Sequence, residues 1–344
     1  MPYKNILVVG GGAIGGITAA LLTQEGQNVI VLDADKAHVK GMSSGLQITG
    51  FREITIPVKS LTPEEFSGNG YTGWADIVLL AVKGLHTEKA LTAVLPCMSK
   101  TAPVVSLQNG INEETIAKIV GVERTIACSI TWGGTNKGPG QLIQTTDGGF
   151  IIGQWPTGKS KIVDEIAALL SMAFQTEIAD NILGDRWTKL LITVSLTGVG
   201  TTAGLTYGGV IDNEAARKVA LTVITETYDV GIAAGVKFAD LMGVSPSIVL
   251  VRNKADFDNA SKLLDFAFAN HRPTKPSMWQ DIEKGRKTEV DFVNGYVVRK
   301  GKEVGLKTPA NEMVTKIIKE IEAGKRQPDT SNLKEFDKIT AYIK

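Results

Sequence analysis

The sequence predicts an α/β fold in its first half and an all-helical domain in its second half. Apolar, strand-sized runs alternate with helical patterns in the first half, whereas only helical periodicity follows Asp180. A chain of 344 residues is also long enough for two domains. We therefore expect a boundary near 181–184, with an N-terminal domain at 1–182 and a helical domain at 183–344.

The first half reads as a parallel sheet that helices cover on both faces. Buried strands are expected at 6–9, 28–32, 77–82 and 103–107, with helices at 14–24 and 87–95. Strands that are apolar on both faces and alternate with helices are typical of parallel sheets. Strand-like segments between Thr125 and Gly153, separated by Gly-, Pro- and Asn-rich turns, predict an antiparallel extension of the same sheet. An amphipathic helix should follow at 162–174.

The second half carries helical periodicity throughout. Helices are expected at 185–202, 214–235, 247–270, 288–304 and 312–323.

A glycine motif, Gly10-x-Gly12-x-x-Gly15, stands between the first strand and the first helix. In that context it predicts a Rossmann-type dinucleotide-binding loop. The first glycine permits a tight turn, the second lets the backbone approach a pyrophosphate, and the third permits close helix–strand packing. The expected cofactor-binding residues are Gly10, Gly11, Gly12, Ala13, Ile14 and Gly15. The alternative is a glycine-rich turn without a ligand.

An acidic residue, Asp33, ends the second strand at the distance expected for this motif. A carboxylate there hydrogen-bonds the ribose 2′-OH of NAD and repels the 2′-phosphate of NADP. Asp33 therefore favours NADH, unless Asp33 or Asp35 merely caps the next segment.

Reduction of a carbonyl needs a proton donor. The three histidines, His38, His86 and His271, have no recognisable catalytic context and read as surface or loop residues. Lys189 stands beside Trp187 at the head of an apolar helical run, just past the domain boundary. Burial lowers the pKa of a lysine and suits it to general acid catalysis. Alternatively, its stem lies along apolar surface while its ammonium reaches water.

Composition excludes several classes of function. A net charge of +1 gives no electrostatic support for nucleic-acid binding. The two cysteines form no CxxC motif, no residue cluster has metal-ligand spacing, and no apolar run reaches membrane-spanning length. We expect a cytoplasmic protein without a metal, a membrane segment or a nucleic-acid partner.

Three further stretches complete the pattern: "QNG" at 108–110, "RWTKL" at 186–190 and "SMWQDIEKGRKTEVDFVNG" at 277–295. In these stretches and in the glycine motif, the chain resembles the ketopantoate reductase (2-dehydropantoate 2-reductase) family, and the resemblance covers almost its whole length. The resemblance implies NAD(P)H-dependent reduction of ketopantoate to pantoate, a step of pantothenate biosynthesis.

The resemblance also implies roles for single residues. Lys83 matches a lysine at the adenosine end of the cofactor, and Asn109 an asparagine between nicotinamide and substrate. Lys189 matches the general acid, Ser277 a serine that holds the substrate carboxylate, and Glu289 a glutamate that binds the substrate hydroxyl. Each residue also has a local alternative: Lys83 is a surface lysine, Asn109 a turn residue, Ser277 a helix cap and Glu289 a solvated helix charge.

The chain departs from the family pattern at both ends of the expected site. Asparagines four and eight residues after the lysine are replaced by Thr193 and Thr197, which offer fewer polar contacts to substrate. An arginine that pairs with the 2′-phosphate is replaced by Ala34, after Asp33. The cofactor use of typical family members and the presence of Lys83 favour NADPH, whereas Asp33 favours NADH. The segment 236–276 is longer than the family pattern predicts. Three alternatives are open for it: it reshapes the substrate mouth, it builds a dimer contact, or it is an inert longer helix.

Three hypotheses remain. The first is reduction of a 2-keto acid, ketopantoate in the family pattern. The second is an NAD-dependent D-2-hydroxyacid dehydrogenase that acts on branched or aromatic 2-keto acids. The third, a non-catalytic dinucleotide sensor, is disfavoured because Lys189 and Glu289 are both present. A homodimer through the helical domain is compatible with all three.

Overall fold

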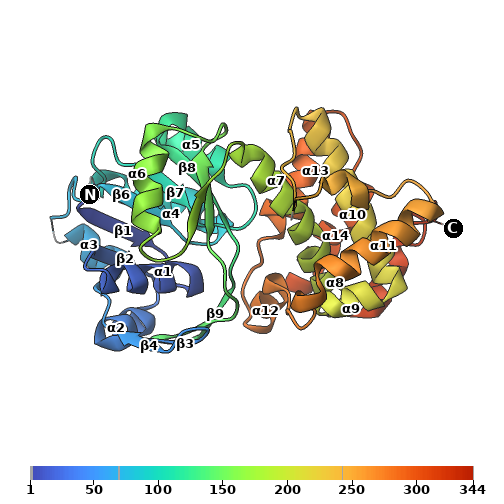
Figure 1. Cartoon of the computed structure of the whole chain (residues 1–344). Coiled ribbons are helices and arrows are strands. Elements are labelled where there is room, and N and C mark those ends of the chain that lie inside the picture. Colours follow the sequence, from blue (N-terminus) through green and yellow to red (C-terminus); the bar gives the residue numbers. More distant parts are fainter. Residues whose placement is uncertain (1–2, 69, 242, 344) are drawn as a thin grey trace. The chain divides into compact units, whose positions relative to one another are not determined.

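The computed structural model describes residues 3–68, 70–241 and 243–343. The chain divides between Leu183 and Gly184 into two compact units, here called unit 1 and unit 2 (Figure 1). Unit 1 is built on a mixed sheet and unit 2 on helices, which confirms the predicted fold class.

The main sheet of unit 1 has eight strands in the order β12-β11-β8-β7-β6-β1-β2-β5. Within the described residues, the pairs from β5 through β2, β1, β6 and β7 to β8 are parallel, and β11 pairs antiparallel with β8. The strands are β1 (Asn5–Val9), β2 (Asn28–Leu32), β5 (Ser60–Leu61), β6 (Ile77–Leu80), β7 (Val104–Ser106), β8 (Thr125–Ile130), β11 (Phe150–Gln154) and β12 (Thr176–Ile178).

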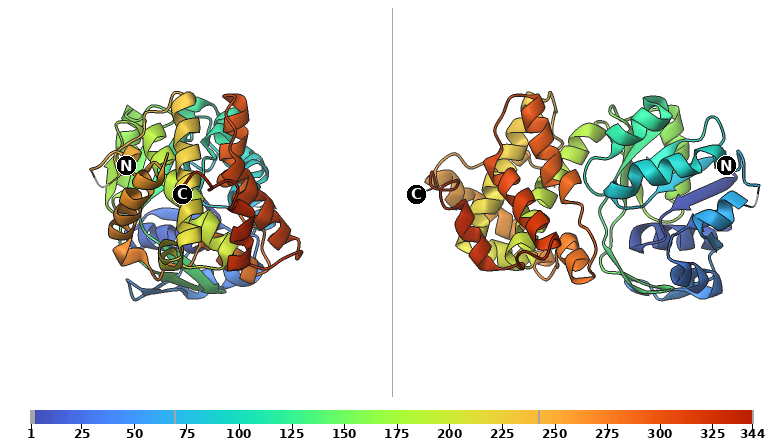
Figure 2. Two further views of the ribbon diagram at one scale, coloured as in Figure 1. Left: turned by 90° about the vertical axis from the view of Figure 1, so that its right-hand side faces the viewer. Right: turned by 180° about the vertical axis from the view of Figure 1, so that it is seen from behind.

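Alternating side chains of the buried strands build a core on each face of this sheet. Ile6 and Val8 of β1 pack in a core with α1 and α6, whereas Leu7 and Val9 pack in a second core with α3, α4 and α5. Figure 2, right, shows α4 and α5 in front of the sheet. The helices are α1 (Ala13–Gln24), α2 (Lys36–Gly45), α3 (Pro63–Gly68), α4 (Thr87–Val94), α5 (Glu113–Val120) and α6 (Lys161–Leu170).

A second sheet corrects the expected antiparallel extension. The strands β3 (Leu46–Gly50), β4 (Ile54–Ile56), β9 (Gly134–Gly138) and β10 (Gln141–Gln144) form a separate sheet in the order β4-β3-β10-β9. The prediction that all strands of 125–153 extend one sheet was therefore wrong, because β8 pairs parallel with β7 and the β9–β10 hairpin leaves the main sheet. Leu142 of β10 instead packs on Gly16 of α1.

The regular secondary structure in the described residues of unit 2 is helical, apart from an isolated bridge between Leu241 and Val244. Its longest helix, α10, packs beside α14, as Figure 2, left, shows. The α-helices are α7 (Ile182–Ile192), α8 (Gly200–Ala203), α9 (Tyr207–Asp212), α10 (Glu214–Ala233), α11 (Lys254–Ala267), α12 (Ser277–Glu283), α13 (Asn294–Glu303) and α14 (Pro309–Glu322).

Three of the expected helices of unit 2 are shorter or less regular than their sequence pattern. The run 185–202 contains a π-helix, η4 (Thr193–Val199). The run 247–270 is a short 3₁₀ turn, η5 (Pro246–Val249), followed by α11 and the turn η6 (Ala269–His271). The run 288–304 begins with the 3₁₀ turn η7 (Val290–Phe292), and its α-helix begins at Asn294.

Hydroxyl side chains bond backbone carbonyls in and directly after the π-helix η4. Ser195 Oγ donates to the carbonyl of Leu191 at 2.7 Å, and Thr201 Oγ1 donates to the carbonyl of Thr197 at 2.7 Å. Hydroxyls that bond carbonyls of the preceding turn compete with the regular ladder of an α-helix. Runs with i→i+5 bonds are rare and are frequent at functional sites.

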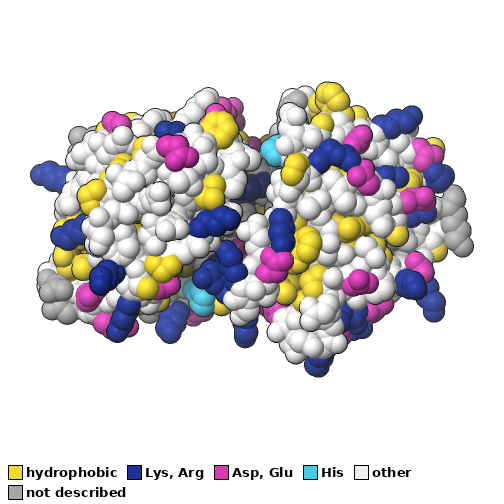
Figure 3. Space-filling view, turned by 90° about the horizontal axis from the view of Figure 1, so that it is seen from below, with side chains coloured by type: hydrophobic (Ala, Val, Ile, Leu, Met, Phe, Trp, Pro, Cys, Tyr) yellow, Lys and Arg dark blue, Asp and Glu magenta, His cyan; other side chains and the backbone are white. Residues whose placement is uncertain are grey.

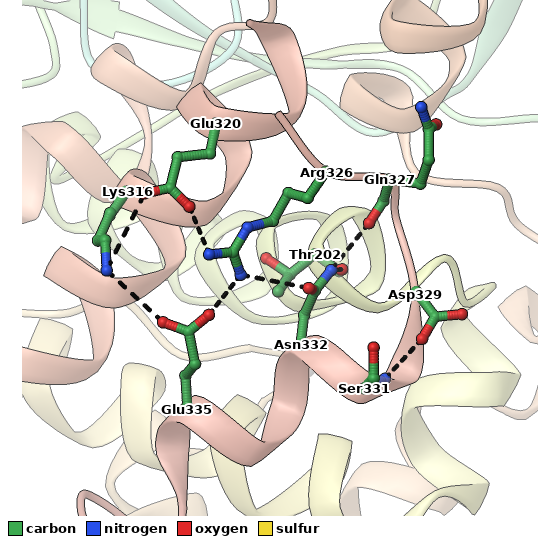
Figure 4. A network of polar contacts seen from close by, with 9 residues as sticks. All are labelled: Thr202, Lys316, Glu320, Arg326, Gln327, Asp329, Ser331, Asn332 and Glu335. Carbon is green, nitrogen blue, oxygen red and sulfur yellow. Dashed lines mark hydrogen bonds and ion pairs between the residues drawn. The ribbon is translucent and has the colours of Figure 1, made fainter. Parts of the chain in front are cut away.

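The C-terminal segment, here called the C-terminal latch, bonds the end of α8, the helix that directly follows η4 (Figure 4). Asn332, in the turn η8 (Thr330–Phe336), donates through Nδ2 to the carbonyls of Thr202 and Gln327, both at 2.9 Å. Arg326 pairs with Glu335 and, at 2.5 Å, with Glu320 of α14. The C-terminal segment therefore joins the end of α8 to α14.

Candidate active site

The expected cofactor residues of unit 1 lie at one edge of the main sheet. The glycine loop follows β1, Asp33 follows β2, Lys83 follows β6 and Asn109 follows β7. These four strands are adjacent and parallel, so their carboxyl ends meet at the same edge. Open α/β sheets bind ligands in the crevice outside the carboxyl ends of their strands.

The glycine loop has the geometry that its motif requires. Gly10 has a φ of +105°, and a Cβ there would lie 2.8 Å from the backbone of Ala81. A Cβ at Gly15 would collide with the carbonyl oxygen of Gly10, which shows how closely α1 packs on the loop. A Cβ at Gly12 would meet nothing within 4 Å, so this side of the loop is open. The loop therefore fits a pyrophosphate at the N-terminus of α1, where Ala13 and Ile14 begin the helix.

Asp33 does not cap the helix that follows it. Its Oδ2 accepts from the N–H of Gly11 at 2.8 Å, and its Oδ1 accepts from the N–H of Asp35 at 2.9 Å. Asp35 is the residue that caps α2, because its side chain accepts from the N–H groups of Ala37 and His38. The Asp33 carboxylate is thus held against the glycine loop.

His38 corrects an expectation, because it was assigned to the surface or to a loop. It lies in α2, is 2% exposed and hydrogen-bonds Gly11 of the glycine loop. The spacing of apolar residues gave no sign of this, because Val39 and Met42 alone mark the buried side of α2. His38 is a candidate site residue that sequence reasoning missed.

The loops that carry Lys83 and Asn109 are joined by Gln108, a second residue that sequence reasoning did not assign. Gln108 is 3% exposed and donates through Nε2 to the carbonyl of Val82 at 2.7 Å and to Thr87 Oγ1 at 2.8 Å. The carbonyl of Asn109 accepts from Asn112 Nδ2 at 2.7 Å. The backbones at Lys83 and Asn109 are therefore fixed relative to each other.

Lys189 lies elsewhere in its helix than expected. It stands in the last turn of α7 rather than at a helix start, and it is partly buried. Its neighbour Trp187 is 2% exposed and packs edge-on against Phe238 and Tyr296. The aromatic cluster anchors this turn of α7, so the backbone at Lys189 is fixed within unit 2.

Thr193 and Thr197 lie on the π-helix η4, which begins directly after α7, the helix of Lys189. Thr193 Oγ1 donates to the carbonyl of Lys189 at 3.2 Å, and Thr197 Oγ1 lies 2.8 Å from the hydroxyl of Tyr207. Both threonines are buried, at 8% and 4% exposure. Burial raises the pKa of Tyr207, so its phenol stays neutral and hydrogen-bonds Thr197. Both threonine hydroxyls therefore have partners inside unit 2.

Ser277 is the exposed first residue of α12, and the N-cap position of this helix is held by Pro276. The helix α12 packs against η4, and Pro276 packs on Gly200 directly after η4. The N–H of Tyr207 donates to the carbonyl of Thr274 at 3.0 Å, which holds the approach to α12. Because Pro276 and not Ser277 stands at the N-cap, the structure does not support the helix-cap alternative for Ser277.

Glu289 is not part of an α-helix. It is partly buried and stands directly before η7. Its neighbour Thr288 donates through both its N–H and its Oγ1 to Glu322 Oε1, at 2.7 and 2.6 Å. Asn294, five residues later, donates to the carbonyl of Val194 at 3.1 Å. This stretch is thus tied to η4, which directly follows the α7 helix of Lys189. Glu289 stands at the N-cap of a 3₁₀ turn and is partly buried, and its role toward a substrate stays a prediction.

A buried polar network supports η4 from the other side. Asn294 Nδ2 also donates to Asn311 Oδ1 at 2.9 Å, and Asn311 donates through its N–H and Nδ2 to Glu226. Burial raises the pKa of Glu226 to about 7, although the N–H groups of Ala310 and Asn311 and the side chain of Asn311 oppose this shift.

Two other kinds of site are absent from the described residues. No group of three or more His, Cys, Asp and Glu side chains there is placed to hold a metal ion. None of the helices in the same residues is long and apolar enough to cross a membrane. On the face of unit 2 drawn in Figure 3, basic and acidic side chains lie interspersed, with apolar patches between them.

Comparison with known families matches nearly the whole chain. Residues 6–157 match the model of "Ketopantoate reductase PanE/ApbA", and residues 181–322 match "Ketopantoate reductase PanE/ApbA C terminal". The 2-dehydropantoate 2-reductase of Pyrococcus abyssi is 30% identical over 93% of this chain and 98% of the relative. The same enzyme of Pyrococcus horikoshii is 29% identical over 92% of this chain and 96% of the relative.

Solved structures share the fold. A PanE/ApbA family ketopantoate reductase from Ralstonia eutropha JMP134 has a TM-score of 0.77 at 26% identity, and covers 93% of this chain and 99% of its own. D-mandelate dehydrogenase, solved with NADH and anilino(oxo)acetate, has a TM-score of 0.80 at 24% identity and the same coverage.

Proposed function

The chain belongs to the ketopantoate reductase family of oxidoreductases, and from this premise we propose that it reduces ketopantoate to pantoate with NAD(P)H. Its similarity to 2-dehydropantoate 2-reductases over almost their full length carries the proposal. The similarity spans the dinucleotide edge of unit 1 and the Lys189 helix of unit 2. This coverage argues against a non-catalytic dinucleotide sensor.

A bound nicotinamide dinucleotide would supply the hydride for the carbonyl carbon. The loop from Gly10 to Gly15 would hold its pyrophosphate, with Ala13 and Ile14 offering backbone N–H groups at the start of α1. Lys83 would contact its adenosine end, and Asn109 would lie beside its nicotinamide. The open side of Gly12 and the strand edge of unit 1 support this assignment.

Lys189 would donate a proton from Nζ to the C2 oxygen as the hydride arrives. General acid catalysis of this kind contributes about 10²–10⁴-fold to a rate. Glu289 would bind the substrate hydroxyl, and Ser277 would bind its carboxylate. A carboxylate near the ammonium would offset part of the cost of burying each charge.

We also propose that NADH is preferred over NADPH. The Asp33 carboxylate is fixed on the glycine loop by the N–H groups of Gly11 and Asp35, at the end of β2. A 2′-phosphate placed there would meet a negative charge, and two unit charges at about 4 Å interact by roughly 4 kcal/mol at an effective dielectric constant of 20. Ala34, which follows, offers no cation in return.

A second candidate function is the dehydrogenation of more apolar D-2-hydroxy acids with NAD. The hydroxyls of Thr193 and Thr197 are bonded to the carbonyl of Lys189 and to Tyr207, respectively. Each of these hydroxyls therefore already has one partner within unit 2, whereas an amide at the same position would offer a second polar group. This favours a branched or aromatic substituent over the 4-hydroxyl of ketopantoate.

A homodimer through unit 2 is a further proposal. Phe266 of α11 is 84% exposed, and Leu263, one turn earlier, is 36% exposed. Light scattering on the purified protein and on F266D tests it: the wild type should have the mass of two chains and the variant that of one. A monomeric wild type would contradict the dimer.

Initial rates of NADH and NADPH oxidation test the function. Each nucleotide is combined with ketopantoate and with 2-ketoisocaproate, an apolar 2-keto acid. Turnover with ketopantoate supports the first function, and turnover confined to 2-ketoisocaproate supports the second. If the protein binds NADH but oxidises it with neither acid, both functions are contradicted.

A further inference from the structure

His38 links the glycine loop to the turn between β9 and β10. Its Nε2 lies 2.7 Å from the carbonyl oxygen of Gly11, and its Nδ1 accepts from the N–H of Gly140 at 3.0 Å. The side chain is 2% exposed, so water does not compete for these bonds. Next to it, Gly41 of α2 lies so close to Gly140 that a Cβ at Gly41 would come within 2.6 Å of the Gly140 nitrogen.

These two partners fix the tautomer of His38. The carbonyl of Gly11 can only accept, so Nε2 must carry a proton. The N–H of Gly140 can only donate, so Nδ1 must be without one. The ring is therefore a neutral imidazole that donates to the glycine loop and accepts from the hairpin.

The bond to Gly11 determines the orientation of a peptide group in the glycine loop. A trans peptide is planar, and its N–H points opposite to its carbonyl. Fixing the Gly11 carbonyl therefore fixes the direction of the Gly12 N–H, at the N-cap of α1. The peptide before it is fixed in turn, because the Gly11 N–H donates to Asp33.

We propose that His38 is a positioning residue for the dinucleotide: it holds the Gly11–Gly12 peptide in the orientation that receives the pyrophosphate. The proposal rests on the proposed binding of NAD(P)H at this loop. Glycines leave a loop more backbone freedom than other residues do. A side chain that removes this freedom before binding spares the ligand the cost of ordering the loop.

Three variants separate positioning from stability. H38A removes both bonds. H38Q offers an amide donor and a carbonyl acceptor, so it can restore both. V39A is the control, because Val39 is the next residue of α2, is 8% exposed and packs in the core without a side-chain hydrogen bond. NADH affinity is measured by fluorescence titration, KM and kcat by initial rates, and Tm by thermal unfolding without nucleotide.

We expect H38A to raise the Kd and KM for NADH about tenfold, the effect of losing one buried hydrogen bond. Its kcat at saturating NADH and its KM for the keto acid should stay within about twofold of the wild type, and H38Q should recover most of the NADH affinity. V39A should lower the Tm without changing NADH affinity.

Two results would overturn the proposal: an unchanged NADH affinity in H38A, or an equal loss of affinity in V39A. A wild-type protein that binds NADH but reduces no keto acid would contradict the proposed function. The NADH titration would still test His38 in that case.

Discussion

The hydroxyls of Thr197 and Tyr207 lie 2.8 Å apart and form a hydrogen bond inside unit 2. Thr197 stands at one of the two positions where the family pattern has an asparagine, so this bond uses the one polar group that the position retains. The same tyrosine also holds the segment just before Ser277, because its N–H donates to the carbonyl of Thr274. Tyr207 therefore connects two of the proposed substrate residues.

The first prediction concerns substrate choice. Y207F removes the partner of the Thr197 hydroxyl and leaves that hydroxyl able to bond a polar substrate. The ratio of kcat/KM for ketopantoate over 2-ketoisocaproate should rise about fivefold, the worth of one hydrogen bond. T197V is the matched variant, because it has no hydroxyl to release and should not raise the ratio. A ratio that is the same in Y207F and the wild type would remove Thr197 from the substrate site.

The second prediction concerns cofactor choice. D33N keeps an oxygen that can accept from the N–H of Gly11 but removes the negative charge. The ratio of kcat/KM for NADPH over NADH should rise at least about tenfold, because a 2′-phosphate no longer meets a carboxylate. D35N is the control, since Asp35 caps α2 instead. An equal change in both variants would assign the effect to the fold of α2.

The third prediction concerns the pH dependence of stability. Burial raises the pKa of Glu226 to about 7, whereas the ordinary value is 4.5. The unfolded chain releases this proton at the lower pH, so the free energy of unfolding should fall as the pH rises from about 4.5 to 7. The difference between the two pKa values corresponds to roughly 3 kcal/mol.

Urea unfolding at pH 5 and pH 8 measures this effect. E226Q cannot ionise and should lose about 2–3 kcal/mol less than the wild type between these two pH values. Its stability at pH 5 should be lower, because its amide group faces the N–H donors of Ala310 and Asn311. D240N, a change at an exposed carboxylate of unit 2 that does not act on the pKa of Glu226, is the control. The same pH dependence in E226Q and the wild type would contradict a protonated Glu226.

The fourth prediction concerns the C-terminal latch (Figure 4). N332A removes the donor to the carbonyls of Thr202 and Gln327 and should lower the free energy of unfolding by about 1–3 kcal/mol. S331A changes an exposed neighbour in the same turn and should have a small effect. Equal urea midpoints for the two variants would show that the latch does not stabilise unit 2.

Local patterns predicted the dinucleotide half of the fold well. The strands β1 and β2 and the helix α1 lie within one residue of their expected bounds, because each combines a buried apolar run with a glycine or a polar residue at its end. The residues at this sheet edge could be placed together because they follow adjacent parallel strands. Their roles toward a ligand stay predictions.

Long-range contacts explain most of what the sequence did not reveal. The strand β10 pairs with β3, which lies more than ninety residues earlier, and no local signal encodes that pairing. His38 bonds Gly11 and Gly140, which lie 27 and 102 residues away from it. At the π-helix, Ser195 bonds the carbonyl of Leu191, and Asn294, about a hundred residues later, bonds the carbonyl of Val194. The apolar run around Lys189 gave no sign of these bonds and looked like one regular helix.

The proposed role of Lys189 is tested most directly by the kcat of K189A with saturating NADH and keto acid. Loss of the general acid should lower kcat by about 10²–10⁴-fold while NADH affinity, measured by fluorescence titration, stays that of the wild type. K262A, a change at an exposed lysine of α11, is the control and should keep full activity. A wild-type kcat in K189A would contradict the mechanism.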